Sequence, residues 1–336
     1  MRKNRELPRG EVRRLEIESR ALAGNLLGDP NRRDLPVYLP PGFKSGDQLP
    51  LLVDLVGFTG SGQSHVNWKN FGENVPERLD RLIGEGRMPA AAVAFPDCFS
   101  RLGGNQYINS AAIGPWADFL IKEAVPFVER KFGCGGYGKR GVFGKSSGGY
   151  GAITHALLYS DFWSASACHS GDMGFDLLQL FDMPRCLRAL AKEGGIQPWL
   201  ETFFAKRKVK DDEVHVLMML AMCATYDPDT SQFMGVRLPV DFDTCEIIAE
   251  RWANWMKWDP LTLVESRAAG LKKLKLVFLD CGDVDQYNLV YGARRMHRAL
   301  QRHAVVHIYE EFPDDHTGID YRMDRSLPLL ATALSR

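Results

Sequence analysis

The 336-residue sequence predicts an α/β fold in which helices cover both faces of a mostly parallel β-sheet. Two observations carry this prediction. Short apolar runs of strand length alternate with amphipathic segments of helix length along most of the chain. Several of these runs are almost continuously apolar, which is typical of strands buried on both faces of a parallel sheet. Residues 171–260 break the alternation, because they hold helical patterns and loops without a strand pattern.

The N-terminal part predicts several strands around one helix. Apolar residues on both sides of the turn signal at residues 28–31 (Gly-Asp-Pro-Asn) indicate an antiparallel hairpin. Two further apolar runs predict buried strands, and a helix is expected between them. The expected elements are the hairpin strands 12–17 and 35–39, the strands 51–56 and 90–95, and the helix 75–83.

The rest of the sheet follows the same alternation. Apolar residues recur at helical spacing from Trp116 to Val128 and lead through Gly133 to a short strand. The pattern resumes after the break and closes with a strand near the C-terminus. The expected elements are the helix 116–128, the strand 141–143, the helix 149–159, the strands 162–168 and 274–279, the helix 289–300 and the strand 305–309.

This order divides the chain into a core, formed by residues 1–170 and 261–336, and a helical insertion (residues 171–260) that is expected to act as a cap. The insertion is rich in aromatic residues, which are expected either to pack the cap on the core or to line an acyl or aryl pocket. These residues include Phe181, Trp199, Phe203, Phe204, Phe233, Trp252 and Trp255.

Composition excludes several classes of protein. The 42 Lys and Arg residues balance 42 Asp and Glu residues, so no nucleic-acid partner is expected. The longest charge-free apolar stretch, 214–226, is shorter than the roughly 20 residues that a membrane span needs. Charged residues occupy the place of a leader's apolar region, which indicates a cytoplasmic protein. Seven cysteines without a C-x-x-C pair predict buried thiols and no metal site.

The strongest motif is residues 144–148 (Gly-Lys-Ser-Ser-Gly), which lie between a predicted strand and a predicted helix. This is the G-x-S-x-G nucleophile elbow, in which glycines on both sides of the serine let the chain reverse sharply. The motif makes Ser146 the candidate nucleophile. A phosphate-binding loop would need glycine at position 139, which is Lys139, and Ser147 as nucleophile would need glycine in place of Lys145.

A serine needs a general base to attack an ester and an acid to orient that base. In doubly wound hydrolases the chain order is serine, acid, histidine. His316 follows the last predicted strand in a polar loop and is the expected base. For the acid, Asp285 lies past the turn after strand 274–279 and is preferred to Asp283. The other aspartate is expected to cap the next helix or hold the turn.

An oxyanion hole needs two backbone N–H groups. The loop at residues 56–60 (Val-Gly-Phe-Thr-Gly) follows an early strand, and its glycine permits a close turn. We expect the N–H groups of Phe58 and Ser147 to converge on the tetrahedral oxygen. The alternative interpretation of residues 56–60 is a plain glycine turn.

With these motifs the sequence resembles the putative-esterase family of α/β hydrolases, which includes esterase D (S-formylglutathione hydrolase), feruloyl and acetylxylan esterases, enterochelin esterases and mycobacterial mycolyltransferases. The resemblance covers most of the chain outside the helical insertion. It is carried by residues 37–43 (VYLPPGF), 56–58, 104–110 (GNQYINS), 144–149, 160–163 (SDFW), 170–171, 281–285 and His316. It implies an α/β-hydrolase fold with Ser146, Asp285 and His316 as the catalytic triad.

The sequence departs from this family in three places. Val56 and Lys145 stand where histidine is frequent, and the helical insertion is longer than in compact members. The predicted activity is hydrolysis of a small to medium acyl or aryl ester through an acyl-enzyme, without a metal or cofactor. An acyltransferase with the same triad and a non-catalytic binding protein on the same fold are the alternatives.

Overall fold

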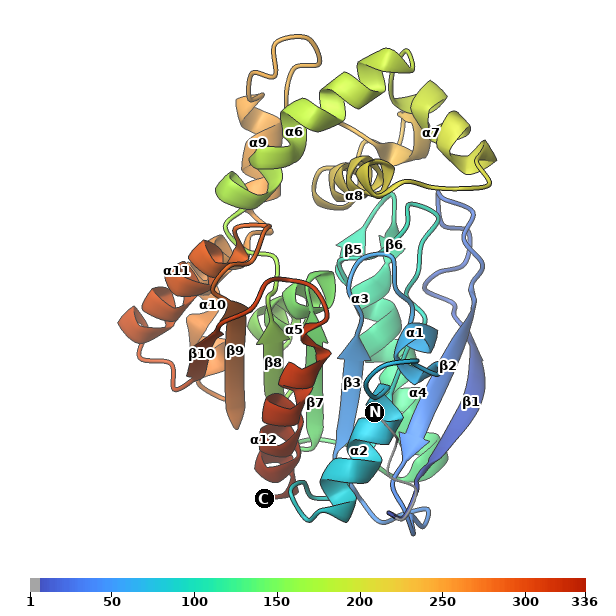
Figure 1. Ribbon diagram of the computed structural model, residues 1–336, viewed down its shortest axis with the longest axis vertical. Helices are drawn as coiled ribbons and strands as arrows, with labels where there is room; N and C mark the ends of the chain where they lie inside the picture. The colour runs from blue at the N-terminus through green and yellow to red at the C-terminus, as the bar shows by residue number, and fades with distance from the viewer. Residues whose placement is uncertain (1–6) are drawn as a thin grey trace.

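The computed structural model describes residues 7–336 and is built around an eight-stranded sheet with the order β1-β2-β4-β3-β7-β8-β9-β10 (Figure 1). Strand β2 pairs antiparallel with β1 and β4, and all other neighbours are parallel. The strands are β1 (Glu11–Glu18), β2 (Arg32–Leu39), β3 (Leu51–Leu55), β4 (Ala92–Ala94), β7 (Arg140–Lys145), β8 (Ala165–His169), β9 (Leu276–Gly282) and β10 (Ile308–Phe312). A separate short ribbon pairs β5 (Asn109–Ser110) with β6 (Gly114–Pro115).

Helices cover both faces of the sheet, as the alternating pattern predicts. Helices α2 (Val75–Gly84) and α12 (Met323–Ser335) share one apolar cluster with Leu52 of β3. The opposite face is covered by the run α3–η1–α4 from Trp116 to Phe132 and by α5, α10 and α11, and Val53 of β3 points to that side. The remaining bounds are α1 (Gly62–Val66), α5 (Ser147–Leu158), α10 (Pro260–Leu271), α11 (Leu289–Arg302) and η3 (Ile319–Arg322).

Helix α2 illustrates how local sequence sets an element. Asn74 accepts a hydrogen bond from the Glu77 N–H (2.9 Å), and the Glu77 carboxylate accepts one from the Asn74 N–H (3.1 Å). This capping box satisfies two amides that the first helical turn leaves without partners. Pro76 in the first turn costs no hydrogen bond there. The helix therefore begins where the sequence predicts it.

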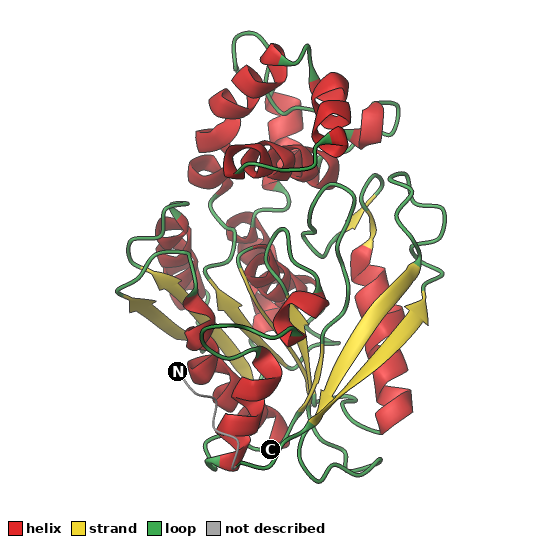
Figure 2. Cartoon of the chain, turned by 45° about the vertical axis from the view of Figure 1, so that its right-hand side comes forward, coloured by secondary structure: helices red, strands yellow, loops and turns green. Residues whose placement is uncertain are grey.

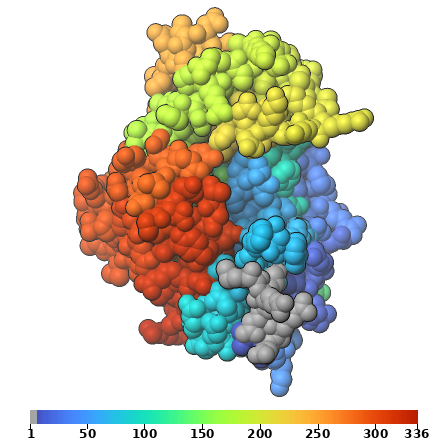
Figure 3. Space-filling model, in the orientation of Figure 1, coloured from blue at the N-terminus to red at the C-terminus, as the bar shows by residue number. Residues whose placement is uncertain are grey.

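The helical insertion forms a layer across the carboxyl ends of the strands (Figures 1 and 2). In the space-filling view this layer, coloured from green through yellow to light orange, spans one end of the molecule (Figure 3). Its chain enters after β8 and leaves before β9, which are direct neighbours in the sheet. It contains α6 (Phe175–Lys192), α7 (Ile196–Ala205), α8 (Asp211–Tyr226), η2 (Phe233–Gly235) and α9 (Ala249–Met256).

Aromatic packing and one carboxylate attach the insertion to the core. The Tyr150 ring of α5 contacts Phe175 and Tyr226, with ring centroids 6.1 and 5.9 Å away, and Tyr226 continues the contact to Trp255 at 5.2 Å. Asp259 is fully buried and accepts hydrogen bonds from the N–H groups of Gly174 (3.1 Å), Phe175 (2.9 Å) and Leu261 (2.9 Å). The segment that enters the insertion and the segment that leaves it are thus both hydrogen-bonded to the Asp259 side chain.

Two strands begin later than predicted, and helix α10 was not predicted. The last strand begins at Ile308 instead of residue 305, because the chain turns at Ala304 (φ 51°) and leaves Val306 92% exposed. Helix α10 lies outside the elements expected from the sequence; Asp259 caps it and Pro260 opens it. Strand β8 begins at Ala165, three residues later than predicted from the apolar run.

No helix within residues 7–336 combines the length and the apolar character needed to cross a membrane. All seven cysteines are free thiols, and six of them are buried. Within the same residues no three His, Cys, Asp or Glu side chains gather as a metal-binding group.

Candidate active site

Ser146 stands at a sharp turn between β7 and α5, at the carboxyl edge of the sheet. Its backbone has φ 59° and ψ −126°. Residues other than glycine rarely adopt this conformation, which costs on the order of 1–3 kcal/mol. The Ser146 N–H donates to the carbonyl of His169 (3.0 Å), which ties the turn to β8. The surrounding sheet therefore enforces the strained turn.

Glycines on both sides make this turn possible. A Cβ atom at Gly144 would lie 2.3 Å from the carbonyl oxygen of Leu55, and one at Gly148 would lie 1.8 Å from the same atom. Both distances are far below contact distance, so neither position tolerates a side chain. The predicted strand-turn-helix context of residues 144–148 is confirmed by β7 and α5.

His316 and Asp285 meet from two different loops. Asp285 follows β9, His316 follows β10, and the imidazole Nδ1 lies 2.8 Å from the Asp285 carboxylate. The second oxygen of Asp285 accepts the N–H of Tyr287 (2.9 Å), and the backbone N–H of His316 donates to the Gln286 side chain (2.9 Å). Both members of the pair are buried, at 8% exposure for His316 and 6% for Asp285.

Asp283, the other candidate acid, is exposed and turns away from this pair. Its backbone N–H donates to the carbonyl of Phe312 (2.9 Å). Its carboxylate makes no hydrogen bond or ion pair with any residue from 7 to 336, and helix α11 is instead preceded by Asn288. The Asp283 side chain therefore neither caps the helix nor holds the turn.

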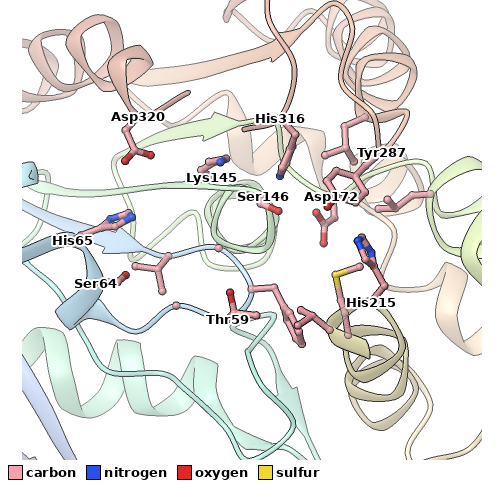
Figure 4. Close-up of a pocket in the computed structure, with 18 of the residues that line it drawn as sticks. Thr59, Ser64, His65, Lys145, Ser146, Asp172, His215, Tyr287, His316 and Asp320 are labelled. Atoms are coloured by element: carbon pink, nitrogen blue, oxygen red, sulfur yellow. The ribbon is translucent and has the colours of Figure 1, made fainter. Parts of the chain in front are cut away.

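Ser146 and His316 line the same pocket, and Figure 4 shows the His316 ring beside Ser146. The Ser146 hydroxyl makes no hydrogen bond with the part of the chain that the structure describes. In enzymes without substrate, such contacts are often long and tighten only when substrate binds. Because Nδ1 of His316 is engaged by Asp285, Nε2 is the nitrogen left to exchange a proton.

The loop at residues 56–60 lies against Ser146. A Cβ atom at Gly57 would lie 3.5 Å from Cβ of Ser146, so the loop passes within van der Waals distance of the serine. The Thr59 N–H donates to the carbonyl of Gly103 (2.9 Å), whereas the Phe58 N–H has no acceptor among the described residues. Ser147 is the first residue of α5, so its N–H also lacks an intrahelical acceptor.

The pocket around Ser146 has a volume of about 430 Å³ and two chemically different walls (Figure 4). The helical insertion contributes an apolar wall formed by Leu178, Val214 and Met218, and it also adds the polar side chains of Asp172, Gln179 and His215 to the lining. The core contributes a polar wall, which includes His65 and Lys145. Sequence analysis did not anticipate that residues of the insertion and of the core line one pocket together with Ser146.

The aromatic residues of the insertion do not line this pocket, so the pocket-lining alternative is wrong for them. Trp199 and Trp255 are buried in the core of the insertion, where Trp255 contacts Tyr226. Phe181 is 71% exposed on the outer surface. The buried aromatic residues therefore serve packing inside the insertion, while Leu178, Val214 and Met218 form the apolar wall of the pocket.

Sequence analysis also missed Asp172, a carboxylate that lines the pocket and is only 6% exposed. It accepts a hydrogen bond from Gln106 (3.3 Å), whose amide also donates to the Ser147 hydroxyl (2.8 Å). Burial raises the pKa of Asp172 to about 6, although His316 and the Gln106 hydrogen bond act in the opposite direction. Its position after β8, at the sheet edge where the other site loops meet, is the signal that could have identified it.

This raised pKa predicts a pH-dependent stability difference for Asp172→Asn. The folded protein holds the Asp172 proton more tightly than the unfolded chain does, so the contribution of this group to the free energy of unfolding falls as the pH rises from about 4 to about 6. Asparagine avoids the cost of the buried charge and can keep the Gln106 contact. The free energy of unfolding of the variant relative to wild type should therefore increase by up to about 3 kcal/mol between pH 4 and pH 7.5. Urea denaturation at both pH values measures this, and a difference that does not change with pH contradicts it.

Comparison with known proteins identifies the family and the fold of this chain. The model of the family described as "Putative esterase" matches residues 30–324. Among solved structures, a ferulic acid esterase superposes with a TM-score of 0.62 at 17% identity, covering 97% of this chain and 99% of that chain. FphF, a fluorophosphonate-binding serine hydrolase of Staphylococcus aureus, gives 0.60 at 16% identity, covering 96% and 99%. An S-formylglutathione hydrolase from Agrobacterium tumefaciens gives 0.58 at 15% identity, covering 97% and 96%.

At these identities the structural likeness shows a shared fold and nothing finer. It confirms the predicted α/β class with a mostly parallel sheet. Among curated proteins none matches this chain.

Proposed function

Since the chain belongs to the putative esterase family and is an esterase with the α/β-hydrolase fold, we propose that it hydrolyses carboxylic esters through a Ser146–His316–Asp285 triad. The single observation that carries the residue roles is the 2.8 Å contact between His316 Nδ1 and the Asp285 carboxylate, in the pocket that Ser146 lines. The membership of the family agrees with the resemblance that the sequence motifs predict.

In the first half-reaction, Ser146 Oγ attacks the ester carbonyl while His316 Nε2 takes the hydroxyl proton. Asp285 keeps the other ring proton on Nδ1 and stabilises the imidazolium that forms. The carbonyl oxygen becomes an oxyanion, which accepts hydrogen bonds from the N–H groups of Phe58 and Ser147. When the tetrahedral intermediate collapses, the C–O bond breaks and Nε2 returns its proton to the leaving alcohol.

In the second half-reaction, water attacks the acyl-enzyme carbonyl and gives a proton to His316 Nε2. Collapse of the second intermediate releases the carboxylic acid and returns the proton to Ser146 Oγ. Each cycle consumes one water molecule and cleaves one ester bond. All catalytic groups in it are side chains and backbone amides of this chain.

We propose that the helical insertion acts as a cap that selects the apolar part of the substrate. Leu178, Val214 and Met218 of the insertion form an apolar wall of the pocket, and Leu289 of α11 in the core also lines it. A volume of about 430 Å³ suits a small to medium acyl or aryl group, because ligand sites of this size enclose most of a small molecule.

A p-nitrophenyl ester series from acetate to decanoate tests this function. We expect kcat/KM to rise by up to about fourfold for each added methylene while the chain fills the apolar wall. Activity should then fall for the longest esters, because the pocket is full. A folded enzyme that hydrolyses none of these esters contradicts the proposal and favours the non-catalytic alternative.

The same assay separates hydrolysis from acyl transfer. An added alcohol such as methanol competes with water for the acyl-enzyme. If hydrolysis is the reaction, the free acid remains the main product at low alcohol concentration. Transfer of most acyl groups to the alcohol under those conditions supports the acyltransferase alternative.

A further inference from the structure

The polar wall of the pocket contains cationic and neutral donors that the proposed triad does not use. Figure 4 shows His65, Lys145 and Asp320 on one side of Ser146, with Asp172 and His215 on the other. His65 comes from α1 after β3, Lys145 ends β7, and Asp320 belongs to η3. Three segments distant in the sequence therefore build this wall at the carboxyl edge of the sheet.

Lys145 is the wall residue without a partner. Its ammonium group is partly buried and makes no hydrogen bond or ion pair with any residue from 7 to 336. Burial lowers the pKa of Lys145, against the attraction of Asp320, Asp285 and Asp315. A desolvated ammonium group without an acceptor is unfavourable, and a bound anion relieves that cost.

The carboxylates near Lys145 are already engaged by other donors. Lys69 forms an ion pair with Asp320, and His316 contacts Asp285 (2.8 Å). Asp315 accepts the N–H of Thr317 (2.6 Å). None of them lies within ion-pair distance of the Lys145 ammonium, so its hydrogen-bonding capacity is open to a ligand.

His65 offers a second donor on the same wall. Its Nδ1 lies 2.6 Å from the carboxylate of Asp54, which is fully buried on β3. Burial opposes protonation of this imidazole, but the Asp54 carboxylate outweighs it, so the pKa of His65 is raised. Nε2 of His65 makes no hydrogen bond with the described residues and can donate to a ligand when the ring is protonated.

We propose that Lys145 and His65 form an anion subsite, so that the substrates of this enzyme are esters carrying a carboxylate or a similar anionic group in their acyl or alcohol part. This inference rests on the proposed ester hydrolysis at Ser146. Lys145, His65 and Ser146 line one pocket, so a single ester molecule can place its anionic group on the two donors and its carbonyl at the serine. The apolar wall formed by the insertion then accepts the other part of the substrate.

Two matched pairs of esters test this subsite. The first pair compares p-nitrophenyl hydrogen adipate with p-nitrophenyl hexanoate and places the anion in the acyl group. The second compares the butyrate ester of 5-hydroxy-2-nitrobenzoate with p-nitrophenyl butyrate and places it in the alcohol. The measured quantity is the ratio of kcat/KM for the anionic ester to kcat/KM for its neutral partner, in which general losses of activity cancel.

We expect Lys145→Met to lower this ratio about tenfold or more in at least one pair, because a charge-assisted hydrogen bond is lost. Lys145→Arg keeps the charge and should restore most of the ratio. Lys122→Met is the matched control, since Lys122 lies on the surface in an ion pair with Asp118, and it should not change the ratio. Equal ratios for wild type and Lys145→Met in both pairs overturn the subsite.

A binding measurement keeps this test separate from the proposed function. Adipamate carries a distal carboxylate and hexanamide does not, and calorimetry measures the affinity of both without any turnover. The subsite predicts tighter binding of adipamate to wild type and loss of that preference in Lys145→Met. If esters are not hydrolysed but this preference is found, the hydrolysis proposal fails and the subsite stands. If esters are hydrolysed without any preference for the anion, only the subsite fails.

Discussion

Ser146→Ala lowers kcat for p-nitrophenyl butyrate by about 10⁶-fold, the loss expected when the nucleophile of a catalytic triad is removed. The reason is that the acyl-enzyme cannot form. Water must then attack the bound ester directly, assisted only by substrate binding and by the N–H donors to the oxyanion. Steady-state kinetics of the purified variant measure this loss. A mass increase of wild type by one acyl group, absent from the variant, locates the covalent step at this serine.

The neighbouring serine supplies the control. Ser147 contributes its backbone N–H to the proposed oxyanion hole, and its hydroxyl only accepts a hydrogen bond from Gln106 (2.8 Å). Ser147→Ala should therefore reduce kcat about tenfold at most, the cost of one hydrogen bond. If Ser147→Ala abolishes activity while Ser146→Ala keeps it, the elbow assignment is wrong.

Asp285→Asn lowers kcat by about 10⁴-fold, because an asparagine amide at this position favours the wrong tautomer of the catalytic histidine. The contact it alters is the 2.8 Å pair between Asp285 and His316 Nδ1. The fold should persist, since asparagine has the same shape and can still accept the N–H of Tyr287. Kinetics and circular dichroism of the variant measure the two effects separately.

Asp283→Asn is the matched comparison, two residues away in the same loop. Its carboxylate is exposed and has no partner among the described residues, so we expect its kcat to stay within about twofold of wild type, as for an ordinary surface substitution. A large loss in Asp283→Asn together with a small one in Asp285→Asn would reverse the choice of acid.

Most of the sheet could be predicted because its strands are short apolar runs separated by amphipathic helices. Strand β3 shows why, since all five of its residues are buried and its side chains serve both faces. Helix α10 was missed because a proline can follow the end of one helix or open the next, and the contacts of the Asp259 carboxylate show that here it opens a helix.

The candidate triad could be predicted because each member follows a strand, and parallel strands end at one edge of the sheet. The residues of the polar wall could not be predicted from the sequence, because they come together only through contacts between distant segments. The pair of His65 with Asp54 joins a short helix to a strand interior, and no local motif marks either residue. Similarly, the sequence shows which residues of the insertion are aromatic, but burial alone decides that Trp255 packs while Met218 lines the pocket.

The carboxylate of Asp259, which binds both ends of the helical insertion, has a consequence for the length of that insertion. The two crossings lie together, and β8 pairs directly with β9 whatever the length of chain between them. The entropic cost of closing such a loop grows slowly with its length, by about 0.6 kcal/mol for each doubling. The insertion can therefore change in length at a small cost in stability, while the loops that carry Ser146, Asp285 and His316 keep their places on the sheet.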